Sequence, residues 1–209
     1  MLGPFAEAFH IVLLEHDVPS SDGERLWQEL EKAHTANGRH YHTLQHLEHL
    51  HAALVGVAHL CADRHALVLA TAYHDAVYDI LRKDNEERSA QLLQKRLQPF
   101  GVSPALIDRA VAHIHATKAH AASTDPDTDL FTDADLSILG AAPADYDHYT
   151  EQVRREYRYY PDLLYNPGRR KVLEHFLAMP VIFKTAAFRE RLEAQARANL
   201  RRELHGYSN

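Results

Sequence analysis

Apolar residues recur three and four positions apart along most of this chain, as one face of an amphipathic helix requires. This pattern is clear over residues 5–14 and 26–33, and residues 21–24 have the spacing of a capping box before the second stretch. Residues 64–73 are nearly all apolar and too long for a strand, so they predict a buried helix. Strand-like alternation is not found at any length. The sequence therefore predicts an all-α fold.

Capping signals divide the middle of the chain into further helices. Residues 84–87 read Asp-Asn-Glu-Glu and predict the start of a helix that Pro99 ends. Ser103-Pro104 predicts another helix start. Residues 121–129 are rich in Asp, Thr and Pro and predict a loop. The charged helices expected after residue 146 can pack internally or across a homodimer.

Length and composition favour one globular domain. The chain has 209 residues, of which 45% are apolar and 25% charged, and we expect a single domain over residues 1–209. Its net charge of -6 argues against a DNA or membrane-surface binder, since both need a basic surface. The single Cys61, the lack of a membrane-spanning run and the lack of a basic signal start predict a cytoplasmic protein.

A histidine and an aspartate stand together at the end of the buried helix. His74 and Asp75 follow the apolar residues 64–73, which would carry them to the centre of the fold. An imidazole and a carboxylate at a buried point are costly unless a cation is present. The pair alone is weak evidence of a metal site, because a histidine at a helix end is more often a hydrogen-bonded structural residue.

Further ligand types occur on either side of this pair. If a helix starts near residue 39, His42, His46 and His49 lie at i, i+4 and i+7 on one face, although a solvent-facing polar stripe is the alternative. Two carboxylates, Asp133 and Asp135, stand where an apolar helical turn is expected to begin. Helix capping is the likelier role for at least one of them.

The order His46, His74-Asp75, Asp135 in a helical chain resembles the HD superfamily of metal-dependent phosphohydrolases. Residues 41–46 look like a Tyr-His-Asn-x-x-His segment of its cyclic-nucleotide phosphodiesterases, with Thr43 in place of the Asn, and residues 134–137 look like their Ala-Asp-Leu-Ser. The resemblance implies that His46, His74, Asp75 and Asp135 bind metal and that His42 protonates the leaving oxygen. Only this resemblance favours Asp135 over Asp133.

A longer resemblance, over residues 20–205, is to a bacterial family of predicted metal-dependent HD phosphohydrolases. The segments that carry it are Arg39-x-Tyr41-His42, residues 73–79, Asn85-Glu86-Glu87-x-Ser89-Ala90, Thr117-Lys118-x-His120, residues 133–136, Glu156-Tyr157 and Gly168-Arg169. It implies an HD-domain helical bundle with additional N- and C-terminal helices. We expect a metal-binding core at about residues 39–140 and a helical extension at about 143–205.

The expected activity is hydrolysis of a small phosphate ester, such as a nucleotide or a related phosphomonoester or diester, by a metal-activated water. One or two divalent ions (Mn, Fe, Mg, Co, Ni or Zn) would bind, and Asp75 could bridge a pair. Candidate phosphate-binding side chains share a positive or imidazole group and are Arg39, Lys118, His120 and Arg169. Glu86 and Asp79 are candidates for ordering water, with helix capping as the alternative at residues 84–87.

Two other functions are compatible with the same residues. In a diiron oxygenase of the HD type, two added histidines between the HD pair and the last Asp hold iron. The candidates here begin only at His113, and because His113 and His115 are two apart on a helix, at least one should be on the surface. A catalytically silent nucleotide sensor that signals through its C-terminal helices is the third hypothesis.

Overall fold

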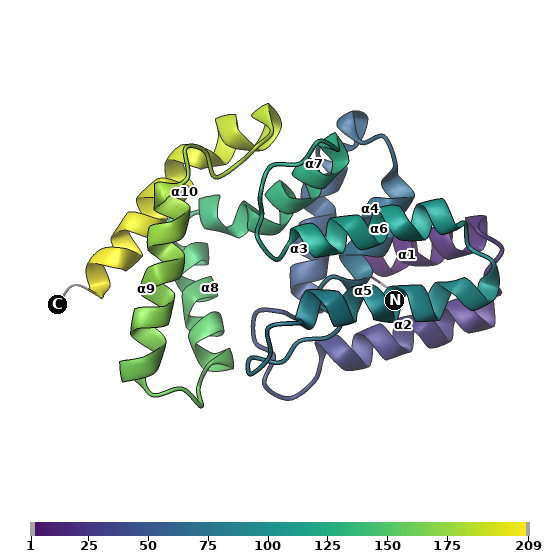
Figure 1. Cartoon of the computed structure of the whole chain (residues 1–209), viewed down its shortest axis with the longest axis horizontal. Helices are drawn as coiled ribbons and strands as arrows, with labels where there is room; N and C mark the ends of the chain where they lie inside the picture. The colour runs from purple at the N-terminus through teal and green to yellow at the C-terminus, as the bar shows by residue number, and fades with distance from the viewer. Residues whose placement is uncertain (1–2, 208–209) are drawn as a thin grey trace. The chain divides into compact units, whose positions relative to one another are not determined.

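The computed structural model describes residues 3–207, and every regular element among them is helical (Figure 1). The predicted all-α class is therefore confirmed. The described chain divides into two compact units, Met1–Thr132 and Asp133–Asn209, with the boundary inside one helix. The second unit thus begins about ten residues before the helical extension that the sequence predicts.

The first unit contains six α-helices and the first part of a seventh. Their bounds are α1 Pro4–Glu15, α2 Ser20–His34, α3 Leu44–Val55, α4 Arg64–Tyr73, α5 Asn85–Leu97, α6 Pro104–Ala116 and α7 Pro126–Asp135. Two short 3-10 helices, η1 Ala58–Leu60 and η2 Gln98–Phe100, follow α3 and α5.

Helix α4 is the centre of this unit. It packs against α1, α3, α5 and α6, and every residue from Ala66 to Tyr73 is buried. The helix has the predicted bounds. Asp63 is its N-cap residue, and the Asp63 carboxylate accepts a hydrogen bond from the Ala66 amide at 3.0 Å. The amides of Ala62 and Asp63 in turn donate to the buried carboxylate of Asp127. Because its neighbours surround it, α4 holds its C-terminal residues in a fixed place.

The second unit contains η3 Leu136–Gly140, α8 Pro143–Glu156, α9 Asp162–Ala178 and α10 Ala186–Gly206. Helix α10 packs against η3 and α9. A side chain at Gly140 would bring its Cβ within 2.6 Å of the Leu192 Cβ, so the close approach of η3 to α10 needs a glycine. The buried guanidinium of Arg169 donates to both carboxylate oxygens of Glu203, at 2.7 and 2.9 Å, and joins α9 to α10.

Three local predictions were wrong. Helix α3 begins at Leu44, so residues 39–43 are not helical. Helix α7 begins at Pro126, within the segment predicted as a loop. Asp133 and Asp135 lie in the last turn of α7, and the expected apolar helical turn, η3, begins directly after Asp135. The residues that form a capping-box pattern at 21–24 lie inside α2, which begins at Ser20 without a side-chain cap.

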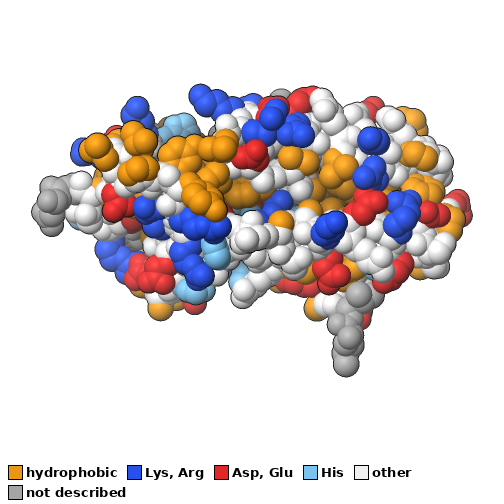
Figure 2. All heavy atoms as spheres, turned by 90° about the horizontal axis from the view of Figure 1, so that it is seen from below, with side chains coloured by type: hydrophobic (Ala, Val, Ile, Leu, Met, Phe, Trp, Pro, Cys, Tyr) orange, Lys and Arg blue, Asp and Glu red, His pale blue; other side chains and the backbone are white. Residues whose placement is uncertain are grey.

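Basic and acidic side chains are interspersed on the face shown in Figure 2, without a continuous basic field. Within residues 3–207, no helix has both the length and the apolar character to cross a membrane.

Candidate metal centre

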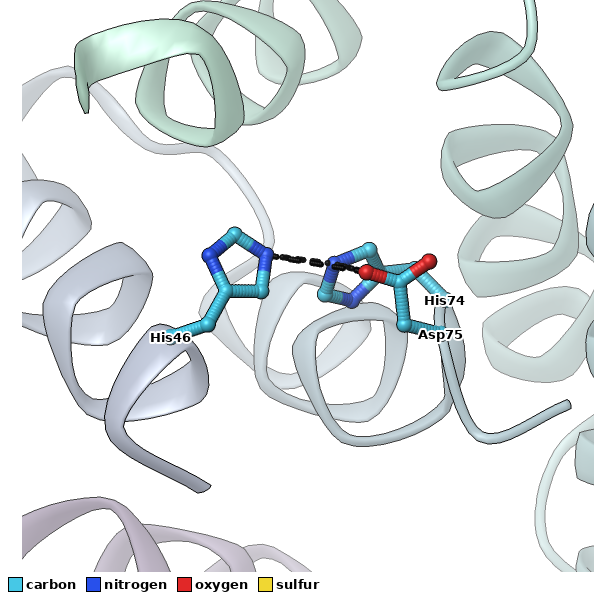
Figure 3. A group of neighbouring side chains, drawn as sticks. All are labelled: His46, His74 and Asp75. Atoms are coloured by element: carbon cyan, nitrogen blue, oxygen red, sulfur yellow. Dashed lines mark hydrogen bonds and ion pairs between the residues drawn. The ribbon is translucent and has the colours of Figure 1, made fainter. Parts of the chain in front are cut away.

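His46, His74 and Asp75 converge at one place in the first unit (Figure 3). His46 comes from the first turn of α3, and the other two residues follow the last turn of α4. The Nε2 atoms of the two histidines lie 3.1 Å apart, and the Oδ2 atom of Asp75 lies 3.1 Å from His74 Nε2 and 3.7 Å from His46 Nε2. These three predicted ligands are therefore brought together, and the cluster could hold a metal ion.

The hydrogen bond on the far side of His74 identifies which ring nitrogen carries the proton. His74 Nδ1 lies 3.0 Å from the carbonyl oxygen of Thr71, and a carbonyl can only accept, so Nδ1 carries a proton. In the neutral ring, Nε2 then carries no proton, and its lone pair faces the carboxylate of Asp75. Two such acceptors 3.1 Å apart repel unless a proton or a cation lies between them. The donor set thus fits a cation, and a metal-bound histidine usually donates its other ring N–H to a carbonyl or carboxylate, as His74 does to Thr71.

The separations within the cluster also fit a transition ion. Two nitrogens that each bind tetrahedral zinc at the usual length are ~3.3 Å apart. The 3.1 Å between His46 and His74 is close to that value, and both side chains are almost fully buried. A mixed nitrogen and oxygen set of this kind suits several divalent transition ions.

The electrostatics of Asp75 point the same way. Burial alone would raise the pKa of this carboxyl, but the imidazoles of His74 and His42 outweigh it and hold the pKa well below its usual range. Asp75 is therefore ionised at neutral pH and offers an anionic oxygen to a bound cation.

His42 lies beside the cluster, although not on α3 as predicted. Its Nε2 is 4.0 Å from Asp75 Oδ2, and its ring stacks on Tyr78 with 4.3 Å between the centroids. Tyr41 packs against the rings of both His42 and His46, with centroids 5.0 Å apart in each case. The irregular segment before α3 thus brings His42 to the metal ligands, while its side chain keeps about a fifth of its surface exposed.

Arg39 connects the His42 segment to the turn after Asp75. Its Nη1 donates to the His42 carbonyl at 2.9 Å, and its Nη2 donates to the Ala76 carbonyl at 3.2 Å. The guanidinium also lies over the ring of Tyr78, 5.3 Å from its centroid. The sequence assigned Arg39 to phosphate binding, and these contacts indicate that it also fixes the position of His42.

The segment Asn85-Glu86-Glu87-x-Ser89 has a structural role that the sequence did not reveal. The Ser89 hydroxyl accepts a hydrogen bond from the Val77 amide at 3.0 Å, and the Asn85 side chain exchanges two hydrogen bonds with the backbone of Asp79. Both residues therefore hold the turn that follows the HD pair. Glu86 lies, partly exposed, in the first turn of α5 between them.

The other predicted site residues of the first unit lie in varied surroundings. Lys118 is exposed and donates to the carbonyl of Lys83 at 3.1 Å. His120 is partly buried and has a left-handed backbone, with φ of 49°. His113 is fully buried with Nδ1 2.8 Å from the Thr128 hydroxyl, whereas His115 is exposed, as expected for one of this pair.

Asp133 and Asp135 have different surroundings in the second unit. The fully buried carboxylate of Asp133 accepts hydrogen bonds from the amides of Lys184 and Thr185 at 2.9 and 2.8 Å, and one from the Thr185 hydroxyl at 2.8 Å. It therefore holds the backbone just before α10, which is a different role from the capping of its own helical turn that the sequence favoured. Asp135 is partly exposed at the end of α7 and stays a predicted ligand.

Arg169 has its donors occupied inside the second unit. Besides both oxygens of Glu203, it donates to the Tyr149 hydroxyl at 3.4 Å and lies over the Tyr149 ring. Its predicted role in phosphate binding stays a prediction.

One partner of the cluster had no signal in the sequence. The Thr71 carbonyl orients His74, but it is a backbone group, and any residue at this position could supply it.

Comparison with known proteins adds no name to this centre: no family model matches the chain, and it matches neither a curated protein nor a solved structure.

Proposed function

We propose that this protein is a metal-dependent phosphohydrolase of the HD type that acts on a small phosphate ester, such as a nucleotide. The observation that carries the proposal is the convergence of His46, His74 and Asp75 with His42 beside them. Three of the four residues that the HD resemblance implies as ligands belong to this cluster. Asp135 is the proposed fourth.

A divalent ion, when bound, would polarise the phosphoryl group and make a water molecule acidic enough to attack near neutral pH. His46 and His74 would supply neutral nitrogens to hold it, and Asp75 would supply an anionic oxygen. The Thr71 carbonyl keeps His74 in the tautomer whose Nε2 can bind. Mn, Fe, Mg, Co, Ni and Zn are the candidate ions.

His42 is the proposed proton donor to the leaving oxygen. Its side chain is partly exposed, and its Nε2 lies 4.0 Å from Asp75 Oδ2. The Tyr78 ring and the hydrogen bond from Arg39 to the His42 carbonyl restrict the position of this residue. General acid catalysis by a positioned histidine accelerates such reactions by about 10²–10⁴-fold.

Lys118 is an exposed residue, whereas Arg39 and His120 are partly buried, so it is the predicted phosphate-binding group of the first unit that is most open to an anion from solvent. Its ammonium has three protons and donates one to Lys83, so two stay available for phosphate oxygens. His120 follows two residues later and completes the proposed contact.

The test is hydrolysis of a panel of nucleotide mono-, di- and cyclic phosphates, with the products separated by chromatography because a cyclic phosphate yields a monophosphate and not free phosphate. Protein stripped of metal with a chelator is reloaded separately with each candidate ion. We expect hydrolysis with at least one ion and its loss in His74→Ala. His42→Ala should keep the metal and lose activity by about 10²–10⁴-fold.

The matched control is His49→Ala, because His49 lies on α3 like His46 but is exposed and outside the cluster. Its activity should equal that of the wild type. Oxygen uptake by the iron-loaded protein without hydrolysis of any panel compound would instead favour the oxygenase. Equal activity of His74→Ala and wild type would contradict the proposed site.

A further inference from the structure

A second pair of histidines in the first unit has nearly the same separations as His46 and His74, although the angle between its ring planes is 89° instead of 57°. His16 follows the last residue of α1, and His65 is the second residue of α4. His16 Nε2 lies 3.0 Å from His65 Nδ1, and the ring centroids are 5.1 Å apart. The corresponding values for His46 and His74 are 3.1 and 5.2 Å. We propose that His16 and His65 form a second binding site, for a transition ion such as Zn²⁺, Ni²⁺ or Cu²⁺.

A carboxylate on the far side of His65 supports this assignment independently. Glu15 Oε2 lies 3.0 Å from His65 Nε2. An ionised carboxylate can only accept, so Nε2 carries the ring proton and Nδ1 presents a lone pair towards His16. A carboxylate behind the imidazole fixes the tautomer and raises the basicity of the nitrogen that binds metal.

The proton balance at the pair is simple. Without an ion, the proton on His16 Nε2 is donated to His65 Nδ1 across the 3.0 Å contact. Binding of an ion needs the other neutral tautomer of His16, in which the ring proton has moved from Nε2 to Nδ1, so that both facing nitrogens direct lone pairs at the ion.

Both histidines are carried by helix ends that are held by other bonds. At the end of α1, the Val18 amide donates to the Leu13 carbonyl at 3.0 Å, and Asp17 has a left-handed φ of 60°, as in a Schellman motif. At the start of α4, Asp63 caps the Ala66 amide. Because α1 and α4 pack against each other, the two imidazoles are preorganised.

The donor set decides the class of ion. Two imidazole nitrogens suit Zn²⁺, Ni²⁺ and Cu²⁺, whereas Mg²⁺ and Ca²⁺ prefer oxygen ligands. His65 keeps about 40% of its side-chain surface exposed, so water can complete the coordination. With only two protein ligands, the site should bind more weakly than the buried cluster, with which it shares no residue.

Zn²⁺ alone is the probe, titrated by calorimetry at pH 7.5 into the full chain carrying His74→Ala and Asp75→Ala. These substitutions remove two ligands of the first cluster. We expect one remaining ion per chain and its loss on adding His16→Gln. Glu15→Gln should weaken binding by about tenfold, the lower end of what a partner behind a ligand contributes.

The matched control is His148→Gln, which removes an exposed histidine and should leave the titration unchanged. If the chain with both substitutions fails to fold, the comparison moves to the wild type, where His16→Gln should reduce the number of bound zinc ions by one. Unchanged zinc stoichiometry in His16→Gln would overturn the proposal, as would equal loss in His148→Gln.

Discussion

The Nε2 atom of His74 lies 3.1 Å from the Nε2 atom of His46. Because His74 Nδ1 donates its proton to the Thr71 carbonyl, Nε2 of the neutral His74 ring carries no proton. The two residues come from different helices, α3 and α4. Two buried nitrogen atoms at this distance are stabilised when both bind the same cation.

His46→Ala should lower the metal content of the purified protein by at least one ion per chain, because it removes a buried nitrogen ligand. Elemental analysis of the protein measures this directly. His49→Ala, on the same helix and exposed, should retain the wild-type content. Full metal content in His46→Ala would rule out the cluster as the binding site.

We expect Asp133 to contribute to the stability of the fold and Asp135 to contribute to metal binding. Asp133→Ala leaves the amides of Lys184 and Thr185 without their hydrogen-bond acceptor. It also removes the counter-ion of the buried Lys184 ammonium, which lies 3.4 Å from the carboxylate. Breaking a buried pair of this kind should lower the free energy of unfolding by about 3 kcal/mol. Urea denaturation measures the change.

Asp135→Ala is the matched comparison, two residues away on the same helix. It should change the free energy of unfolding much less, because the side chain is partly exposed, and it should lower the metal content if Asp135 is the fourth ligand. The reverse outcome, with stability dependent on Asp135 and metal on Asp133, would exchange the two assignments.

The parts of the fold that the sequence predicts well are those where one signal dominates. Residues 64–73 form α4 with the predicted bounds because a continuous apolar run and the capping Asp63 agree. His74 and Asp75 stand out in the sequence because they end this helix, whereas His46 was implied as a ligand by the HD resemblance. Local agreement of burial and capping makes such segments predictable.

The errors arose where two signals conflicted. The i, i+4 spacing of His42 and His46 imitates a helix, but α3 begins only at Leu44, and His42 reaches the cluster from an irregular segment. Pro126 lies in a stretch that reads as a loop by composition, yet proline suits the first turn of a helix, where its missing amide proton costs nothing. Residues such as Thr71 act through the backbone and leave no mark in the sequence.

Arg39→Lys should separate positioning from substrate binding. Lysine keeps the positive charge but lacks the fork that joins the His42 and Ala76 carbonyls. If Arg39 positions His42, kcat should fall by about 10²-fold with KM nearly unchanged, because a misplaced proton donor weakens the transition state alone. Steady-state kinetics on the best substrate of the panel measures both constants.

The control for this substitution is Arg25→Lys, since Arg25 forms exposed ion pairs on α2 with Asp22 and Glu29. It should leave both constants unchanged. A rise in KM at constant kcat in Arg39→Lys would instead show that Arg39 binds the substrate equally well in the ground state and in the transition state. That result would favour the phosphate-binding role that the sequence predicts.

His34 should make the stability of the protein sensitive to acid. It ends α2, is fully buried, and its Nδ1 donates to the Leu30 carbonyl at 2.9 Å. Burial, with a contribution from the charge of Arg39, lowers its pKa to about 3 from the ordinary 6.5. Between these values the unfolded chain binds a proton at His34 that the folded chain does not, so the free energy of unfolding decreases as the pH falls through this window.

The expected slope from this one group is about 1.4 kcal/mol per pH unit between the two pKa values. His34→Asn keeps an amide donor for the Leu30 carbonyl and cannot titrate, so its free energy of unfolding should decrease less steeply between pH 6 and pH 4. Urea denaturation at several pH values gives both slopes. His148→Asn should retain the wild-type slope, because His148 is exposed. Equal slopes for wild type and His34→Asn would mean that His34 accepts a proton in the folded chain as readily as in the unfolded one.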